Sequence, residues 1–194
     1  PGSLDHSPGY LFVEMLSRFF SPYELNPLNH NPLRDVLSKV IDFAALRAGG
    51  KVKFFTCAAN VLTGRLRIFE CHEQSVDTVL ASACLPFMFQ AVEVNGEHYW
   101  DGGYMGNPPI FQLIYKCESR DVVLVMINPI AIDKVPKGAR AIMDRIKMLS
   151  FNSSLMREMR AINFVSRLID SGFDDGGRLK KMLIHCIDAE EKMR

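Results

Sequence analysis

The sequence lacks the features that mark several specialised protein classes. It contains only five Cys among 194 residues, none at C-x-x-C spacing, so neither a zinc site nor a closed disulfide framework is indicated. No apolar run approaches the roughly 20 residues needed to span a membrane, and no stretch has the pattern of a secretory signal peptide. Net charge is also scarce: 23 Lys and Arg balance 22 Asp and Glu, which argues against a nucleic-acid binder driven by a basic field.

The composition that is present is typical of a globular domain. The chain is 48% hydrophobic and 23% charged, and its length suits one domain spanning residues 1–194. Isolated Cys residues such as Cys84 are expected to be small core side chains in a reducing compartment, which predicts a cytoplasmic protein. The opening Pro1-Gly2-Ser3, without an initiator Met, indicates a cloning remnant.

Periodicity and turn signals predict alternating helices and strands before residue 100. Asn31 and Pro32 form a good N-cap and first helical residue for a helix that Gly49-Gly50 ends. Asn95-Gly96 suits a type I′ turn between two strands of a hairpin. The further predicted elements are an aromatic-faced helix over 10–20, strands over 51–58 and 65–69 around a Thr63-Gly64 turn, a short helix capped by Ser75, and hairpin strands over 91–94 and 97–100.

The second half of the sequence favours an α/β architecture. Residues 122–127 form a continuous apolar run without alternation, which predicts a strand covered on both faces. Apolar residues at helical spacing follow over 142–165, and a second apolar run over 182–187 predicts a last strand. This mix of helices and strands predicts an α/β fold.

One acidic residue stands in a position that suits chemistry. Asp101 ends the hairpin strand and is followed directly by Gly102 and Gly103. Glycines permit close backbone approach, so another group can reach the carboxylate, which could orient or deprotonate a nucleophile. The alternative at this point is an ordinary turn, because Asp-Gly is among the commonest turn dipeptides.

The residues around Asp101 form a longer block in the sequence. Its positions are Ala81, Ser82, Ala83, Pro86, Gly96, Tyr99, Asp101, Gly102, Gly103, Asn107 and Pro109. This block resembles the patatin-like phospholipase family, in which it reads A-S-x-A-x-P, a hairpin, Y-x-D-G-G or D-G-A, and then N-x-P. Less specific similarity covers residues 56–69 upstream and residues 122–127 and 151–160 downstream, so the resemblance extends over most of the chain.

The resemblance implies a fold and an activity. The fold would be a patatin-like three-layer sandwich with a mostly parallel central sheet, represented here by its C-terminal part. The activity would be hydrolysis of lipid acyl esters, of the phospholipase A or lysophospholipase type, by a Ser–Asp dyad without cofactor or metal. Asp101 matches the catalytic aspartate, and Gly102 and Gly103 support it. Lipid or ester substrates, but no nucleic acid, would be the partners, and peripheral membrane contact is compatible with that role.

The nucleophile of this dyad is not found among the 194 residues. The family's serine stands in G-x-S-x-G, and no Ser of this sequence has that surrounding; the glycine-rich oxyanion loop is missing as well. In the family both lie upstream of the matching segment, so we expect a partial domain, inactive alone and active when joined to an N-terminal segment. The alternative hypothesis is a non-catalytic lipid- or protein-binding module on the same scaffold.

Other chemistry-bearing groups have simpler interpretations. The five His residues have no metal-ligand spacing, and the Asp174–Gly177 string lacks the preceding hairpin and is predicted to be a loop. Asn107-Pro108-Pro109 is expected to shape the loop after Asp101, or to border a substrate cleft. The aromatic face of residues 11–20 is compatible with packing, a lid or a membrane anchor. The helical segment 139–170 carries a net charge of +3, which is typical of a solvated face and also suits anionic lipid.

Overall fold

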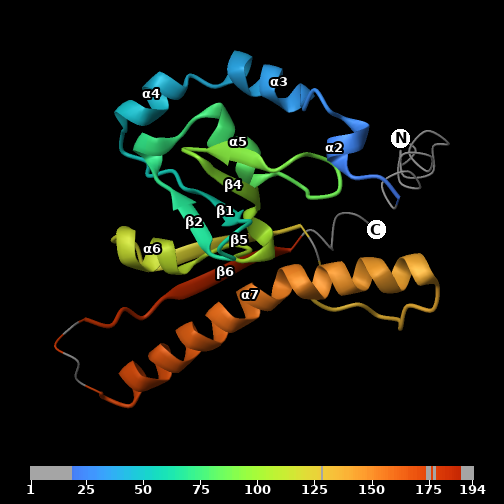
Figure 1. Ribbon diagram of the computed structural model, residues 1–194. Helices are drawn as coiled ribbons and strands as arrows, with labels where there is room; N and C mark the ends of the chain where they lie inside the picture. The colour runs from blue at the N-terminus through green and yellow to red at the C-terminus, as the bar shows by residue number, and fades with distance from the viewer. Residues whose placement is uncertain (1–18, 128, 174–175, 177, 189–194) are drawn as a thin grey trace. The chain divides into compact units, whose positions relative to one another are not determined.

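The computed structural model describes residues 19–127, 129–173, 176 and 178–188. Within it the chain divides into two compact units, residues 1–105 and 106–194 (Figure 1). Most of the predicted helix over 10–20, and three residues of the 174–177 string, lie outside the described residues. That both units belong to one partial domain stays a prediction.

The first unit combines short helices with a four-stranded sheet. Its helices are α2 (Pro22–Leu25), α3 (Pro32–Val40), α4 (Phe43–Ala48) and α5 (Val76–Ser82), with 3-10 turns η2 (Cys71–Glu73) and η3 (Gly102–Tyr104). Its strands are β1 (Thr56–Asn60), β2 (Leu66–Phe69), β3 (Val92–Val94) and β4 (Glu97–Asp101).

The sheet of the first unit has the order β2-β1-β4-β3, and every neighbouring pair is antiparallel. Tight turns account for two of these pairings, since antiparallel strands can be joined by a few residues and parallel ones cannot. Asn95 and Gly96 have φ angles of 55° and 80°, as the predicted type I′ turn requires. The α/β class is confirmed, although in this unit the expected parallel pairing is replaced by antiparallel pairing.

The core of the first unit lies between the sheet and α5. Ala58, Phe69, Ala81, Val94 and Tyr99 form one buried cluster, in which the Tyr99 ring meets Phe69 edge-on with centroids 5.4 Å apart. α5 packs on this face of the sheet, and α3 packs in turn on α5 (Figure 1). The cluster fixes β4, the strand that ends at the predicted site.

The predicted helix between Asn31 and Gly49 is interrupted. Asn31 caps α3 as expected, its side chain accepting the Leu33 N–H at 3.1 Å. The chain then leaves the helix at Ile41, and Asp42 caps a new helix, α4, by accepting the Ala45 N–H at 2.9 Å. A second capping residue within one apolar periodic run thus divides it into two helices.

The second unit is built on a parallel strand pair and a long helix. Its elements are α6 (Phe111–Lys116), β5 (Asp121–Met126), α7 (Ala139–Asp170) and β6 (Leu183–Asp188). β5 and β6 pair in parallel, with Leu124 opposite Cys186. The buried cluster of this unit comprises Ile110, Val122, Leu124, Leu155 and Met182.

The prediction that both faces of β5 are covered is wrong. Val122 and Leu124 are buried, whereas Val123 and Val125 are 58% and 70% exposed. The buried cluster that includes Leu155 of α7 lies on the face of β5 that carries Val122 and Leu124, as in a sheet covered on one side. A continuous apolar run is therefore not sufficient to establish burial on both faces.

Candidate active site

Asp101 is held at the end of β4 by backbone pairing on two sides. It lies opposite Ala58 of β1 in the antiparallel register. Its N–H donates to the carbonyl oxygen of Cys84 at 2.9 Å, which ties it to the segment that follows α5. The strand end thus brings together two parts of the predicted family block that are separated by the hairpin.

The Asp101 carboxylate is only partly satisfied. Its Oδ1 accepts the N–H of Gly103 at 2.7 Å and so caps η3, the turn that begins at Gly102. No hydrogen bond to Oδ2 is present in the part of the chain that the structure describes. Burial raises the pKa of the carboxyl, and the Gly103 N–H opposes this shift. A half-buried carboxylate with a raised pKa and a spare oxygen suits a general base.

Gly102 makes a contact that only glycine allows. A Cβ at this position would lie 2.3 Å from the carbonyl oxygen of Cys57 and 2.5 Å from its Sγ. Because the nearest atom belongs to the backbone of β1, a side chain here would force the strand and η3 apart. Gly102 is therefore needed for the close approach of η3 to the sheet.

Two thiols and a phenol lie close enough to the Asp101 carboxylate for its charge to affect their pKa values. Burial raises the pKa of Cys57 to about 11, and the negative charge of Asp101 adds to the shift. Burial likewise raises the pKa of Cys84 to about 11, with a further contribution from Asp101. The pKa of Tyr104 is also raised, first by burial and then by Asp101. These three neighbours are neutral at pH 7, so none of them carries a positive charge that would stabilise the Asp101 carboxylate.

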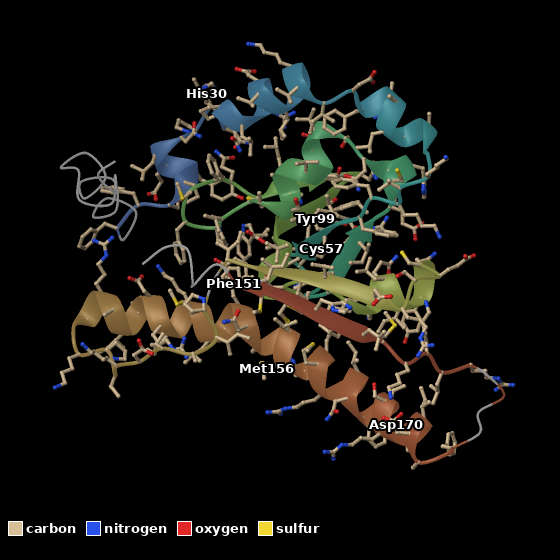
Figure 2. The ribbon with its side chains drawn as sticks, turned by 180° about the vertical axis from the view of Figure 1, so that it is seen from behind. His30, Cys57, Tyr99, Phe151, Met156 and Asp170 are labelled. Carbon is tan, nitrogen blue, oxygen red and sulfur yellow. The ribbon has the colours of Figure 1, made fainter. Side chains whose placement is uncertain are left out.

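These neighbours were only partly foreseen. Cys84 was expected to be a small core residue, and it is 2% exposed. No local sequence signal places Cys57 or Tyr104 beside Asp101. Cys57 and Tyr99, labelled in Figure 2, come from the two adjacent central strands β1 and β4. The placement of Cys57 depends on that pairing, which links residues far apart in the chain.

Other members of the predicted block have structural partners. The hydroxyl of Ser82 donates to the Val79 carbonyl oxygen at 2.7 Å, within its own helix. His98 is exposed on β4 while Tyr99 is buried, which confirms the expected alternation. Asn107 belongs to the second unit, where its N–H donates to Ser154 Oγ at 3.0 Å.

Within the described residues, no group of three His, Cys, Asp or Glu could hold a metal ion.

The sequence model of one protein family matches this chain. The match is to the patatin-like phospholipase model and spans residues 7–114, which is more than half of the chain and includes the Asp101 turn. The chain belongs to the patatin-like phospholipase family. A comparison with curated proteins gave no match.

Family membership supports a lipid hydrolase in general. In this patatin-like chain Asp101 lies at a turn that η3 and β1 hold in place. Among the described residues, no helix is both long and apolar enough to cross a membrane. The finer assignments, the dyad and the identity of the substrate, are proposals.

Proposed function

We propose that the protein hydrolyses acyl esters of lipids, of the phospholipase A or lysophospholipase type, and that Asp101 is the base of its Ser–Asp dyad. The single observation that carries the proposal is the environment of the Asp101 carboxylate. One oxygen is fixed by Gly103, and the other has no hydrogen-bond partner in the described structure. The family match makes a lipid ester the substrate class to test first.

The chemistry follows from a base that contacts the nucleophile directly. The spare carboxylate oxygen would accept the proton of a serine hydroxyl while the serine oxygen attacks the ester carbonyl. Asp101 would then return this proton to the departing alcohol as the acyl-serine forms. A water molecule, deprotonated by the same carboxylate, would release the fatty acid and regenerate the serine.

The raised pKa of Asp101 supports this role. A carboxylate in a partly buried site is a stronger base than one in water, because its charged form is less well solvated. In its ionised form the carboxylate can accept a proton. Fixing Oδ1 against Gly103 also removes a rotational freedom, so that the second oxygen keeps one direction.

The seryl nucleophile is proposed to come from a segment outside these 194 residues. Every Ser of the chain lacks the G-x-S-x-G surrounding. Ser82, the Ser of the block that resembles the family, uses its hydroxyl to donate to the Val79 carbonyl oxygen. The complete reading frame that encodes this chain should therefore contain G-x-S-x-G. Sequencing it is the first check.

The function is tested on the full-length protein. We expect hydrolysis of lysophospholipid and short-chain esters, and we expect a serine-reactive fluorophosphonate to abolish it while labelling the serine of G-x-S-x-G. A protein that neither turns over these esters nor reacts with the phosphonate would be a binding module on a patatin-like scaffold, and the proposal would be wrong.

A further inference from the structure

The two halves of α7 have different surroundings within the second unit. In the C-terminal half, Leu155 is buried against β5 and β6, and Met159 and Ile162 pack beside it. In the N-terminal half, apolar side chains are exposed by 42–55% of their surface. They are Ile142, Met143, Ile146 and Leu149, which we call the α7 apolar face.

The α7 apolar face is continuous along the helix. Ile142, Ile146 and Leu149 follow one another at spacings of four and three residues, so they project from one side, and Met143 widens that side by one position. The loop before the helix adds apolar side chains, since Ile132 is 41% and Val135 81% exposed. The helix alone is not apolar enough to span a bilayer.

Cations concentrate around this face. Between Ile130 and Leu149 the chain has five basic residues against two acidic ones, Asp133 and Asp144, although the whole chain carries a net charge of only +1. By the helical period, Lys147 lies next to Met143 at one border of the face, and Arg145 lies next to Leu149 at the other. The Arg145 guanidinium donates to the Ile130 carbonyl oxygen at 2.8 Å, so Lys147 is the border cation that is best placed to reach a lipid headgroup. The basic residues are Lys134, Lys137, Arg140, Arg145 and Lys147.

Other exposed apolar faces lack this charge pattern. On the outer face of the β5–β6 pair, Val123 and Val125 are accompanied by the Asp121–His185 pair. On α3, the basic Arg34 is already paired with Asp77. Of these three faces, the α7 apolar face with its preceding loop has the largest excess of basic over acidic residues.

We infer that the N-terminal half of α7, with the loop before it, is a docking surface for an anionic lipid membrane. The helix would lie in the plane of the interface, with Ile142, Ile146 and Leu149 among the upper acyl carbons. Lys134 and Lys147 have long stems that can follow the apolar surface while their ammonium groups reach lipid phosphates and carboxylates. The apolar face and the basic residues are therefore both complementary to an anionic lipid membrane.

This inference goes beyond the proposed catalysis and can fail independently of it. The readout is co-sedimentation of the full-length protein with vesicles, which requires no turnover. Vesicles of phosphatidylcholine alone are compared with vesicles of phosphatidylcholine and phosphatidylserine. We expect binding to the mixed vesicles that weakens as salt is added, because surface charges are screened. Asp101→Asn is expected to bind like the wild type.

Two variants address the two components of the surface. Ile146→Glu places a carboxylate on the apolar face, and the double variant Lys134→Glu/Lys147→Glu reverses one charge of the preceding loop and one charge at the border of the face. For each we expect about a tenfold loss of affinity for the anionic vesicles. The matched controls are Leu62→Glu and Lys39→Glu, at exposed positions of the first unit, which should bind normally. Circular dichroism establishes that each variant is folded.

Several outcomes would overturn the inference. The wild type could fail to associate with anionic vesicles, or bind phosphatidylcholine vesicles equally well. Ile146→Glu and the lysine variant could bind as tightly as the controls. Alternatively, sizing could reveal a dimer that Ile146→Glu dissociates while vesicle binding is absent, in which case the face contacts a second copy of the chain instead.

Discussion

Gly102 and Cys57 approach so closely that position 102 has no room for a side chain. A Cβ there would lie 2.3 Å from the Cys57 carbonyl oxygen, in the strand next to the one that ends at Asp101. This contact fixes η3 against β1 and thereby sets where the Gly103 N–H meets the Asp101 carboxylate. The geometry of the proposed base thus depends on a residue without a side chain.

The first prediction concerns this contact. Gly102→Ala should lower the free energy of unfolding by about 2 kcal/mol, because overpacking a close contact forces the backbone to shift. Gly50→Ala is the matched control, since a Cβ at Gly50 meets nothing within 4 Å. Urea denaturation of both variants measures the difference. Equal midpoints for the two would contradict the close packing of η3 on β1.

The second prediction concerns the pH dependence of activity. If Asp101 must be ionised to act as a base, kcat/KM should fall as the pH drops through its pKa. Burial raises that pKa above the ordinary value of 3.8, so the acid limb should have its midpoint above 3.8. A pH–rate profile of the full-length protein measures it. An acid limb at or below 3.8 would argue against a partly buried base.

The third prediction concerns the stability of Asp101→Asn. Because the pKa of Asp101 is higher in the folded than in the unfolded state, its protonation favours folding below the unfolded pKa, and this stability is lost as the pH rises through the folded pKa. The neutral Asn can still accept the Gly103 N–H. Asp101→Asn should therefore be at least as stable as the wild type at pH 7.

Denaturant titrations at several pH values test this stability difference. The advantage of Asp101→Asn over the wild type should shrink as the pH falls through the raised folded pKa toward 3.8, and it should be smallest where the wild-type carboxyl is neutral in both states. A variant that is clearly less stable than the wild type at pH 7 would mean that the charge of Asp101 is stabilising, contrary to its raised pKa.

The fourth prediction concerns the start of α6 in the second unit. Glu158 of α7 accepts the N–H of Phe111 at 3.0 Å, although burial raises the pKa of its carboxyl. Glu158→Ala should cost about 1–3 kcal/mol, because it leaves this donor unpaired. Glu158→Gln keeps an acceptor oxygen and should cost less. Thermal or urea unfolding ranks the two, and equal losses would contradict the capping role.

Local signals in the sequence were sufficient for several elements. Asn95-Gly96 specifies the type I′ turn through its positive φ angles, and Ser75 caps α5 by accepting the Thr78 N–H at 3.2 Å. The position of Asp101 at the end of β4 follows from the same hairpin. Each of these features depends on residues only a few positions apart.

Features that depend on distant partners could not be read in this way. The contact of Gly102 with Cys57 requires the β1–β4 register, and the exposure of Val123 depends on which elements cover β5. The break at Asp42 has a different cause, because it is local. The Asp42 cap starts a new helix although the apolar period would continue the first one. Tertiary register and competing caps account for these differences.

The most direct test of the central claim is the turnover of Asp101→Asn in the full-length protein, measured on lysophospholipid beside Glu93→Gln, an exposed carboxylate of the same sheet. With Asp101 as the base, Asp101→Asn should lose at least about 100-fold in kcat while its circular dichroism and unfolding midpoint are maintained, and Glu93→Gln should be unaffected. Turnover of Asp101→Asn at the wild-type rate would contradict the assignment.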